Sequence, residues 1–156
     1  MKNERSGTPQ GMQDMLKKAT TEMLVLFMLR QRPNYIYQLT QEIERLTDKQ
    51  LKFNTLYLAV YRLEANGHIY ISEKRAEGSH LRVYYAITPQ GEEYYQSLKA
   101  TFVSFTGIID HLLALDDELR AKGENNPNCT FEEVLEQLGE SPKSTAEEFL
   151  ESQPTE

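Results

Sequence analysis

The chain has 156 residues, 39% of them hydrophobic and 26% charged, with a formal net charge of −7, which is enough for one globular domain with an appendage. Its single cysteine excludes an internal disulfide, and because no histidine stands at metal-ligand spacing from Cys129 we expect neither a metal site nor a cofactor. The absence of a secretory leader and of a run of about 18 apolar residues predicts a cytoplasmic protein without a membrane segment.

The charge is divided unevenly along the chain. Residues 1–100 hold 14 basic and 11 acidic residues, whereas residues 101–156 hold 3 basic and 13 acidic residues. Only the first part therefore suits a polyanionic partner such as nucleic acid.

The first part of the chain predicts a short arm and two helices. Residues 1–13 mix charged residues with serine, glycine and proline without periodicity, so we expect a disordered N-terminal arm. From Asp14 the apolar residues recur at helical spacing up to Pro33, and Asn34 then stands where it can cap a second helix. The apolar residues are Met15, Leu16, Ala19, Met23, Leu26, Phe27 and Leu29 in the first helix, and Leu39, Ile43 and Leu46 in the second.

Residues 53–67 predict a third helix with two different sides. The side expected to face the core carries Leu56, Ala59, Val60 and Leu63, and the available side carries Asn54, Leu58, Tyr61, Arg62 and Ala65. Gly67 is expected to end this helix in the left-handed conformation. Since a short turn connects the second and third helices, the pair is typical of a helix-turn-helix whose second member is a recognition helix.

After Gly67 the period changes to two, which predicts a β-hairpin. Residues 69–72 belong to its first strand and residues 81–87 to its second, with the turn at Gly78-Ser79. Basic residues gather near the tip, namely Lys74, Arg75, His80 and Arg82.

Thr88 and Pro89 have the residue types of an N-cap and a first helical position, so we expect a fourth helix over residues 89–115. Its apolar residues step by three and four in a heptad seam that consists of Tyr95, Leu98, Phe102, Phe105, Ile109 and Leu112. At 1.5 Å per residue the helix would be roughly 40 Å long, more than a three-helix domain covers. We therefore expect a second copy of the chain to cover the seam in a homodimer.

Residues 116–156 form an acidic C-terminal extension. We interpret residues 116–128 as a linker, because they are charged and then rich in asparagine and proline. Thr130 and Glu133 form a capping-box pattern, which predicts a short helix near residues 130–139. Residues 141–156 are expected to be disordered.

Together these elements predict a mainly α (α+β) fold. It is a winged helix-turn-helix over residues 14–88 with a two-stranded wing, followed by a long C-terminal dimerisation helix. Short segments within it are also distinctive: Thr55-Leu-Tyr57, Tyr61-Arg-Leu-Glu64, Gly67-His-Ile69, Arg82-Val-Tyr-Tyr85, Ile87-Thr88 and Gly91. With these segments, residues 15–115 resemble the PadR-like family of transcriptional regulators.

Two positions and one segment depart from the pattern of that family. Ile36 stands where the family usually has glycine between two tyrosines, and Leu58 stands where a proline is common. Residues 78–82 carry one arginine and one histidine, whereas the wing of the family often carries several consecutive basic residues. A weaker hold of the wing on phosphate is therefore expected.

The resemblance implies a sequence-specific DNA-binding transcriptional regulator, usually a repressor, that binds an inverted-repeat operator in double-stranded DNA as a homodimer. The predicted elements agree, because two recognition helices about one DNA turn (roughly 34 Å) apart require a two-fold dimer. The residues expected to contact DNA are Lys52, Asn54, Thr55, Tyr57, Leu58, Tyr61, Arg62, Lys74, Arg75 and Arg82.

Most of these residues also admit a structural role. Asn54 suits a base contact and a helix N-cap equally. Leu58 and Tyr61 could pack on neighbouring elements, and Arg62 could form an ion pair with a nearby acid. The cations of the wing could belong to an ordinary solvated hairpin edge.

Other functions are also compatible with the sequence. The aromatic seam of the fourth helix could enclose a small apolar effector between two subunits, although a filled dimer core is the simpler interpretation. The chain could instead be a winged-helix protein-interaction module that acts through its acidic C-terminal extension, or the extension could fold back on the basic surface or on the fourth helix. No nucleophile stands beside a plausible base and no glycine-rich phosphate loop is present, so we expect no enzyme activity.

Overall fold

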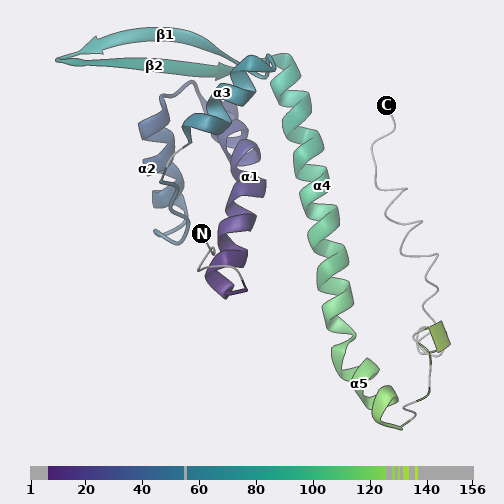
Figure 1. The fold of residues 1–156 in the computed structure, drawn as a ribbon. Helices are drawn as coiled ribbons and strands as arrows, with labels where there is room; N and C mark the ends of the chain where they lie inside the picture. Colours follow the sequence, from purple (N-terminus) through teal and green to yellow (C-terminus); the bar gives the residue numbers. More distant parts are fainter. Residues whose placement is uncertain are drawn as a thin grey trace. The chain divides into compact units, whose positions relative to one another are not determined.

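The structure, a computed structural model, describes residues 7–54, 56–125, 128, 130, 132–133 and 136. The chain forms two compact units, Met1–Gln96 and Ser97–Glu156, each of which is treated by itself below. In chain order the elements are α1 (Pro9–Gln31), α2 (Ile36–Leu46), α3 (Tyr57–Ala65), β1 (Ile69–Glu77), β2 (His80–Ile87), α4 (Pro89–Ala114) and α5 (Asp116–Asn125) (Figure 1).

Helix α1 begins at Pro9, five residues before the expected start at Asp14. Thr8 is its N-cap, and the Thr8 side chain accepts a hydrogen bond from the backbone N–H of Gly11 at 3.0 Å. Pro9 suits the first turn, where its missing N–H costs nothing. The predicted disordered arm over residues 1–13 is therefore wrong for its second half, and residues 1–6 lie outside the described part of the chain.

Helix α2 begins at Ile36 without a side-chain cap, because its N-cap residue is Tyr35. The expected cap, Asn34, is instead buried at 4% exposure and pairs with β2. Leu39 and Ile43 are buried as predicted, whereas Leu46 is 64% exposed in the last turn.

Helix α3 confirms the predicted division into two sides but begins late, at Tyr57. Its N-cap residue is Leu56, which makes no side-chain cap hydrogen bond, so the N-cap role considered for Asn54 is wrong. The chain reaches the helix through a non-helical segment that buries Phe53. The four predicted core residues, Leu56, Ala59, Val60 and Leu63, are all buried. Gly67 follows the helix with a φ of 74°, as expected for a left-handed stop.

Strands β1 and β2 form the wing, an antiparallel hairpin that lies over α2 and α3 (Figure 1). The predicted turn at residues 78–79 is confirmed, and Gly78 has a φ of 61°. The first strand is longer than expected, because β1 continues beyond residue 72 to Glu77. A bulge separates Ile71 from Glu73, and further out Arg75 stands directly opposite Arg82.

A buried carboxylate on α2 supports the base of the wing. Glu42 is 6% exposed and accepts hydrogen bonds from the side chains of Arg32, Asn34 and Gln38. Burial alone would raise the pKa of Glu42, but the hydrogen bonds from Gln38, Arg32 and Asn34 outweigh it and lower the pKa below its ordinary value. Glu42 thereby fixes Asn34, which pairs with the backbone of β2.

The first turns of α4 belong to the same unit as the wing. The hydroxyl of Thr88 accepts from the backbone N–H of Gly91 at 3.0 Å and donates to the carbonyl of Gly67 at 2.7 Å, which confirms the predicted cap. A Cβ on Gly91 would lie only 1.9 Å from the carbonyl oxygen of His68. The helix therefore approaches the start of β1 as closely as glycine permits.

The second unit contains the remainder of α4 and α5. Residues 116–125, expected as a linker, form the helix α5, which starts with three acidic residues that favour its N-terminal end. An 18-residue window of the helical stretch Pro89–Gly123 has a mean hydropathy of 1.4, enough by length and composition alone to cross a membrane, and none of that window is buried. The short helix predicted near 130–139 lies mostly outside the described residues.

The Gly91→Ala substitution should lower the stability of the fold. The added methyl group would force the first turn of α4 away from His68, and such overpacking typically costs about 1–3 kcal/mol. Gly107→Ala is the matched control, because a Cβ there meets nothing within 4 Å and alanine stabilises a helix interior by about 1 kcal/mol. Urea unfolding of both variants measures the two effects, and equal stability of both would contradict the close approach.

The Glu42→Gln substitution should destabilise the protein by about 1–3 kcal/mol at neutral pH, because it leaves the buried amide of Asn34 and the guanidinium of Arg32 without a charged acceptor. The folded-state pKa of Glu42 is lowered, so its stabilisation is present above the ordinary carboxyl pKa and is lost as the pH falls through the folded pKa. Unfolding measured from pH 7 to pH 3 should show the difference from wild type shrinking. A constant difference would mean that the charge of Glu42 contributes nothing.

Candidate nucleic-acid interface

The exposed side of α3 carries large apolar and aromatic side chains beside Arg62. Leu58 is 70% exposed, Tyr61 53% and Tyr57 51%, so these side chains dominate the surface of the helix. Asn54 is exposed in the segment before α3. Thr55 lies outside the described residues. Leu58 and Tyr61 are thus more than half exposed in a single chain and remain accessible to a partner.

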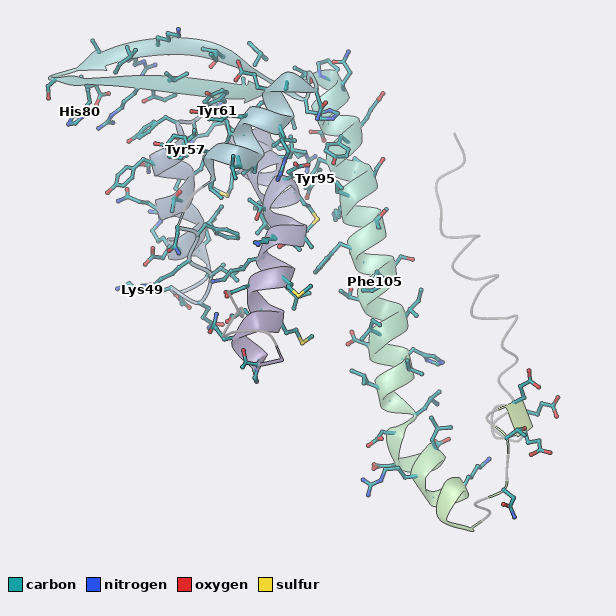
Figure 2. The ribbon with its side chains drawn as sticks, viewed as in Figure 1. Lys49, Tyr57, Tyr61, His80, Tyr95 and Phe105 are labelled. Atoms are coloured by element: carbon teal, nitrogen blue, oxygen red, sulfur yellow. The ribbon has the colours of Figure 1, made fainter. Side chains whose placement is uncertain are left out.

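A groove of about 530 Å³ separates α3 from the underside of the wing. Tyr57 and Tyr61 lie side by side beneath the wing, with ring centroids 6.1 Å apart (Figure 2). Tyr85 also lines the groove but is itself buried, and burial raises the pKa of its phenol. None of the described lining residues is acidic: they are Tyr35, Ile36, Tyr37, Tyr57, Tyr61, His80, Leu81, Arg82, Val83 and Tyr85. In a chain with a net charge of −7, this is a surface that a polyanion can approach.

The two wing arginines are held by the chain's own aromatic rings. The guanidinium of Arg75 lies 4.8 Å from the centroid of Tyr84, and that of Arg82 lies 4.6 Å from the centroid of Tyr35. Tyr35 and Tyr84 themselves meet edge to face at 5.2 Å. Arg82 also donates to the hydroxyl of Tyr35 at 2.9 Å. The arrangement connects the wing to the start of α2 by alternating cations and rings.

The same arginines are also neutralised by acids of the wing. Arg75 pairs with Glu73 at 2.7 Å and Arg82 pairs with Glu77 at 2.8 Å. The hydrogen bond from Arg75 to Glu73 lowers the pKa of Glu73, and the same bond raises the pKa of Arg75. Because Arg75 stands directly opposite Arg82, the glutamates offset a cross-strand repulsion of like charges. A DNA phosphate would have to compete with them.

The other predicted cations differ in their surroundings. Lys52 pairs with Glu44 at 3.4 Å, and Arg62 pairs with Glu22 of α1 at 2.8 Å, so the ion pair considered for Arg62 exists, though with an acid from another helix. Within the described residues, no acid lies at ion-pair distance from Lys74 on the wing or from Lys49 in the turn after α2. Lys49 has a φ of 62° and follows Asp48 with a φ of 48°.

Sequence reasoning missed Tyr35 and Tyr37 as members of the groove, and Glu22 as the partner of Arg62. The two tyrosines flank Ile36 at the start of α2, where two aromatic residues before an amphipathic helix were an available signal. For Glu22 no local signal exists, because Arg62 lies 40 residues later in the chain.

The predicted dimerisation seam on α4 is exposed from its third member, Phe102, onward. Tyr95 is only 5% exposed, because it packs within the first unit against Phe27 and under the guanidinium of Arg30. Most of the Tyr95 side chain is thus already covered within a single chain. Leu98 is half-buried, and the remaining seam residues are exposed, with Phe102 at 40%, Phe105 at 59%, Ile109 at 39% and Leu112 at 49%.

Comparisons with known proteins agree with this geometry. The pattern of the Transcriptional regulator PadR-like family matches residues 25–97. The crystal structure of a PadR family transcriptional regulator from Eggerthella lenta DSM 2243 is 32% identical, with a TM-score of 0.58, over 67% of this chain and 90% of that one. A transcriptional regulator from Clostridium thermocellum is 28% identical, with a TM-score of 0.57, over 62% and 95% of the two chains. The sequence has no significant match among curated proteins.

A third similar structure, the PadR-like transcriptional regulator from Bacillus cereus strain ATCC 14579, is 21% identical and supports the fold alone. Its TM-score is 0.53 over 64% of this chain and 96% of that one. All three relatives are nearly fully covered, whereas the matched part of this chain is between 62% and 67% of its length.

The double substitution Glu73→Gln and Glu77→Gln should tighten binding to random duplex DNA roughly fivefold to tenfold at about 100 mM salt. It frees Arg75 and Arg82 from their acids, so the salt dependence should steepen by up to about two units of slope. Fluorescence anisotropy over a salt series measures both quantities.

The control is Asp116→Asn with Glu118→Gln, which makes the same change in net charge in α5. Equal tightening by both double variants would mean that only the total charge matters.

Proposed function

The chain belongs to the PadR-like family of transcriptional regulators, and we propose that it is a repressor that binds an inverted-repeat operator as a homodimer. Membership of the family makes it a DNA-binding regulator of transcription, not an enzyme. The dimer, the operator symmetry, the sense of regulation and the contact residues are the parts that we propose.

One observation carries the proposal, namely the exposed apolar seam of α4. Four seam residues with large apolar side chains are each at least 39% exposed in a single chain. Leaving so much apolar area in water is unfavourable by about 25 cal/mol per Å², and repetition every three and four residues is what a second helix packs against. A lipid bilayer could also cover such a helix, but a second copy fits a regulator that must reach DNA.

A two-fold dimer fixes the symmetry of the operator. Two copies of α3 related by a two-fold axis read the same sequence on opposite strands, which is an inverted repeat. A dimer that covers such a site competes with the transcription machinery for the same DNA, and this competition favours repression over activation.

The exposed side of α3 supports a division of labour in the contact with DNA. The exposed Leu58 suits thymine methyl groups, and Tyr61 and Asn54 suit hydrogen bonds to base edges. Arg62 suits guanine, whereas Tyr57, Lys52, Lys74, Arg75 and Arg82 suit phosphates. We add Lys49, because it stands in the turn without an acid within ion-pair distance among the described residues.

The domain boundaries follow from the same proposal. Residues 14–88 with the first two turns of α4 form the DNA-binding domain, residues 97–115 the dimerisation helix, and residues 116–156 an acidic extension that starts with α5. The proposed location is the cytoplasm, where the DNA of a regulator of this kind lies. A small apolar effector within the seam is compatible with this arrangement.

The Phe105→Glu substitution tests the dimer and the function together. A charge in the middle of the seam should dissociate the dimer and weaken binding to the DNA upstream of the protein's own gene by at least about tenfold, because each half-site is then bound alone. Footprinting of the wild type should reveal two protected half-sites about one helical turn apart. Analytical ultracentrifugation reports the oligomeric state.

Val103→Glu is the matched control. Val103 is as exposed as Phe105, at 59%, but lies on another side of α4. It should leave the dimer and the DNA affinity unchanged. A wild-type monomer, or a folded wild-type dimer that fails to bind this DNA at about 50 mM salt, would contradict the proposal and favour the protein-interaction module.

A further inference from the structure

A single carboxylate on α1 connects the recognition helix to the first turns of α4. The Oε1 atom of Glu22 accepts from Nε of Arg62 at 2.8 Å, and its Oε2 atom accepts from the hydroxyl of Tyr94 at 3.1 Å. Glu22 is 24% exposed, whereas the side chain of Arg62 is 61% exposed. The inner end of the arginine is therefore held while its outer end faces solvent.

The atoms used in this contact matter for recognition. Arg62 gives Glu22 its Nε, and among the described residues neither of its two terminal nitrogens has a hydrogen-bond partner. These terminal nitrogens form the fork that pairs with O6 and N7 of guanine or with two phosphate oxygens. Glu22 thus occupies the one donor of Arg62 that recognition does not need.

Glu22 is itself kept in place by Tyr94. The ring of Tyr94 stacks on the ring of His68, with centroids 4.2 Å apart and an angle of 18° between the planes. Burial and the hydrogen bond to Glu22 raise the pKa of the Tyr94 phenol, so it remains a donor at neutral pH. The carboxylate has little freedom to rotate, since each of its two oxygens has its own partner.

We infer that Glu22 is a positioning residue for DNA reading, which holds Arg62 by its Nε so that the terminal nitrogens face a base, and that Tyr94 orients Glu22. The inference rests on the proposed function. It assigns specificity to a residue on α1 and another on α4, neither of which needs to contact DNA. Holding the arginine in advance removes part of the entropy that ordering a long side chain would cost on binding.

Two possible roles of Glu22 predict opposite effects on DNA binding, so an experiment can separate them. If Glu22 positions Arg62, then removing Glu22 lowers the preference for the operator. If Glu22 only competes with DNA for Arg62, then removing it raises the affinity for every DNA. The measured quantity is the ratio of affinities for the footprinted operator and for a random duplex of the same length and salt.

We expect Arg62→Ala to lower this ratio roughly tenfold, the effect of losing one good base contact. Glu22→Ala should lower the ratio by about the same factor, because an arginine that is no longer held contacts phosphates as well as bases. Glu22→Gln should keep the ratio within about threefold of wild type, since the amide oxygen still accepts from Nε. Adding Arg62→Ala to Glu22→Ala should cause no further loss, since the two residues act as one unit.

Tyr94→Phe provides a second and milder variant, because Glu22 also joins α1 to α3. It removes only a hydroxyl, and we expect a twofold to threefold lower ratio, on the order of one weakened hydrogen bond, that disappears in the Glu22→Ala background. Thermal unfolding of each variant shows whether the fold is kept.

Two outcomes would overturn the inference while leaving the function intact. In the first, Glu22→Ala and Glu22→Gln both tighten binding to operator and random DNA alike. In the second, the effects of Glu22→Ala and Arg62→Ala simply add. A wild-type protein that binds neither DNA would instead contradict the proposed function.

Discussion

The wing keeps its place over the helices through two backbone hydrogen bonds at its base. The N–H of Asn34 donates to the carbonyl of Tyr85 at 3.0 Å, and the N–H of Tyr85 donates back at 2.8 Å. A two-stranded hairpin is only marginally stable in water, and this bridge gives β2 a second, short partner on the side away from β1. The side chain of Asn34 is buried, which would be costly without the carboxylate of Glu42. The position of the wing, and with it the groove beside α3, depends on this contact.

The groove changes which groups are available to DNA. Cations dominate the surface of many DNA-binding proteins, but here Arg62, Arg75 and Arg82 are each paired with an acid of the same chain. The exposed groups near α3 are instead tyrosine rings and Leu58. Nonspecific attraction grows with the number of free cations, whereas contacts with base edges and methyl groups do not. Under the proposed function, such a surface gives up affinity for any DNA and keeps the contacts that distinguish one sequence from another.

Local patterns predicted much of the fold, whereas contacts between distant residues could not be predicted. The buried side of α3, the stop at Gly67 and the cap at Thr88 follow from spacing and residue type within a few positions. The roles of Asn34 and Asn54 were mistaken, because an asparagine near a helix start fits a cap locally while the tertiary structure decides where the helix begins.

At the candidate site, too, the features that the sequence did not reveal are contacts between residues far apart in the chain. Periodicity assigned Tyr95 to the apolar seam of α4. Only the packing against α1 shows that the first unit already buries this side chain. Arg82 meets Tyr35 from 47 residues away, and no pattern in the sequence joins them. The first turns of α4 therefore belong to the first unit, through Gly91 against His68 and Tyr94 against Glu22. Glu22 contacts both Tyr94 of α4 and Arg62 of α3. A movement of the first turns of α4 would therefore be transmitted to α3 through these side chains.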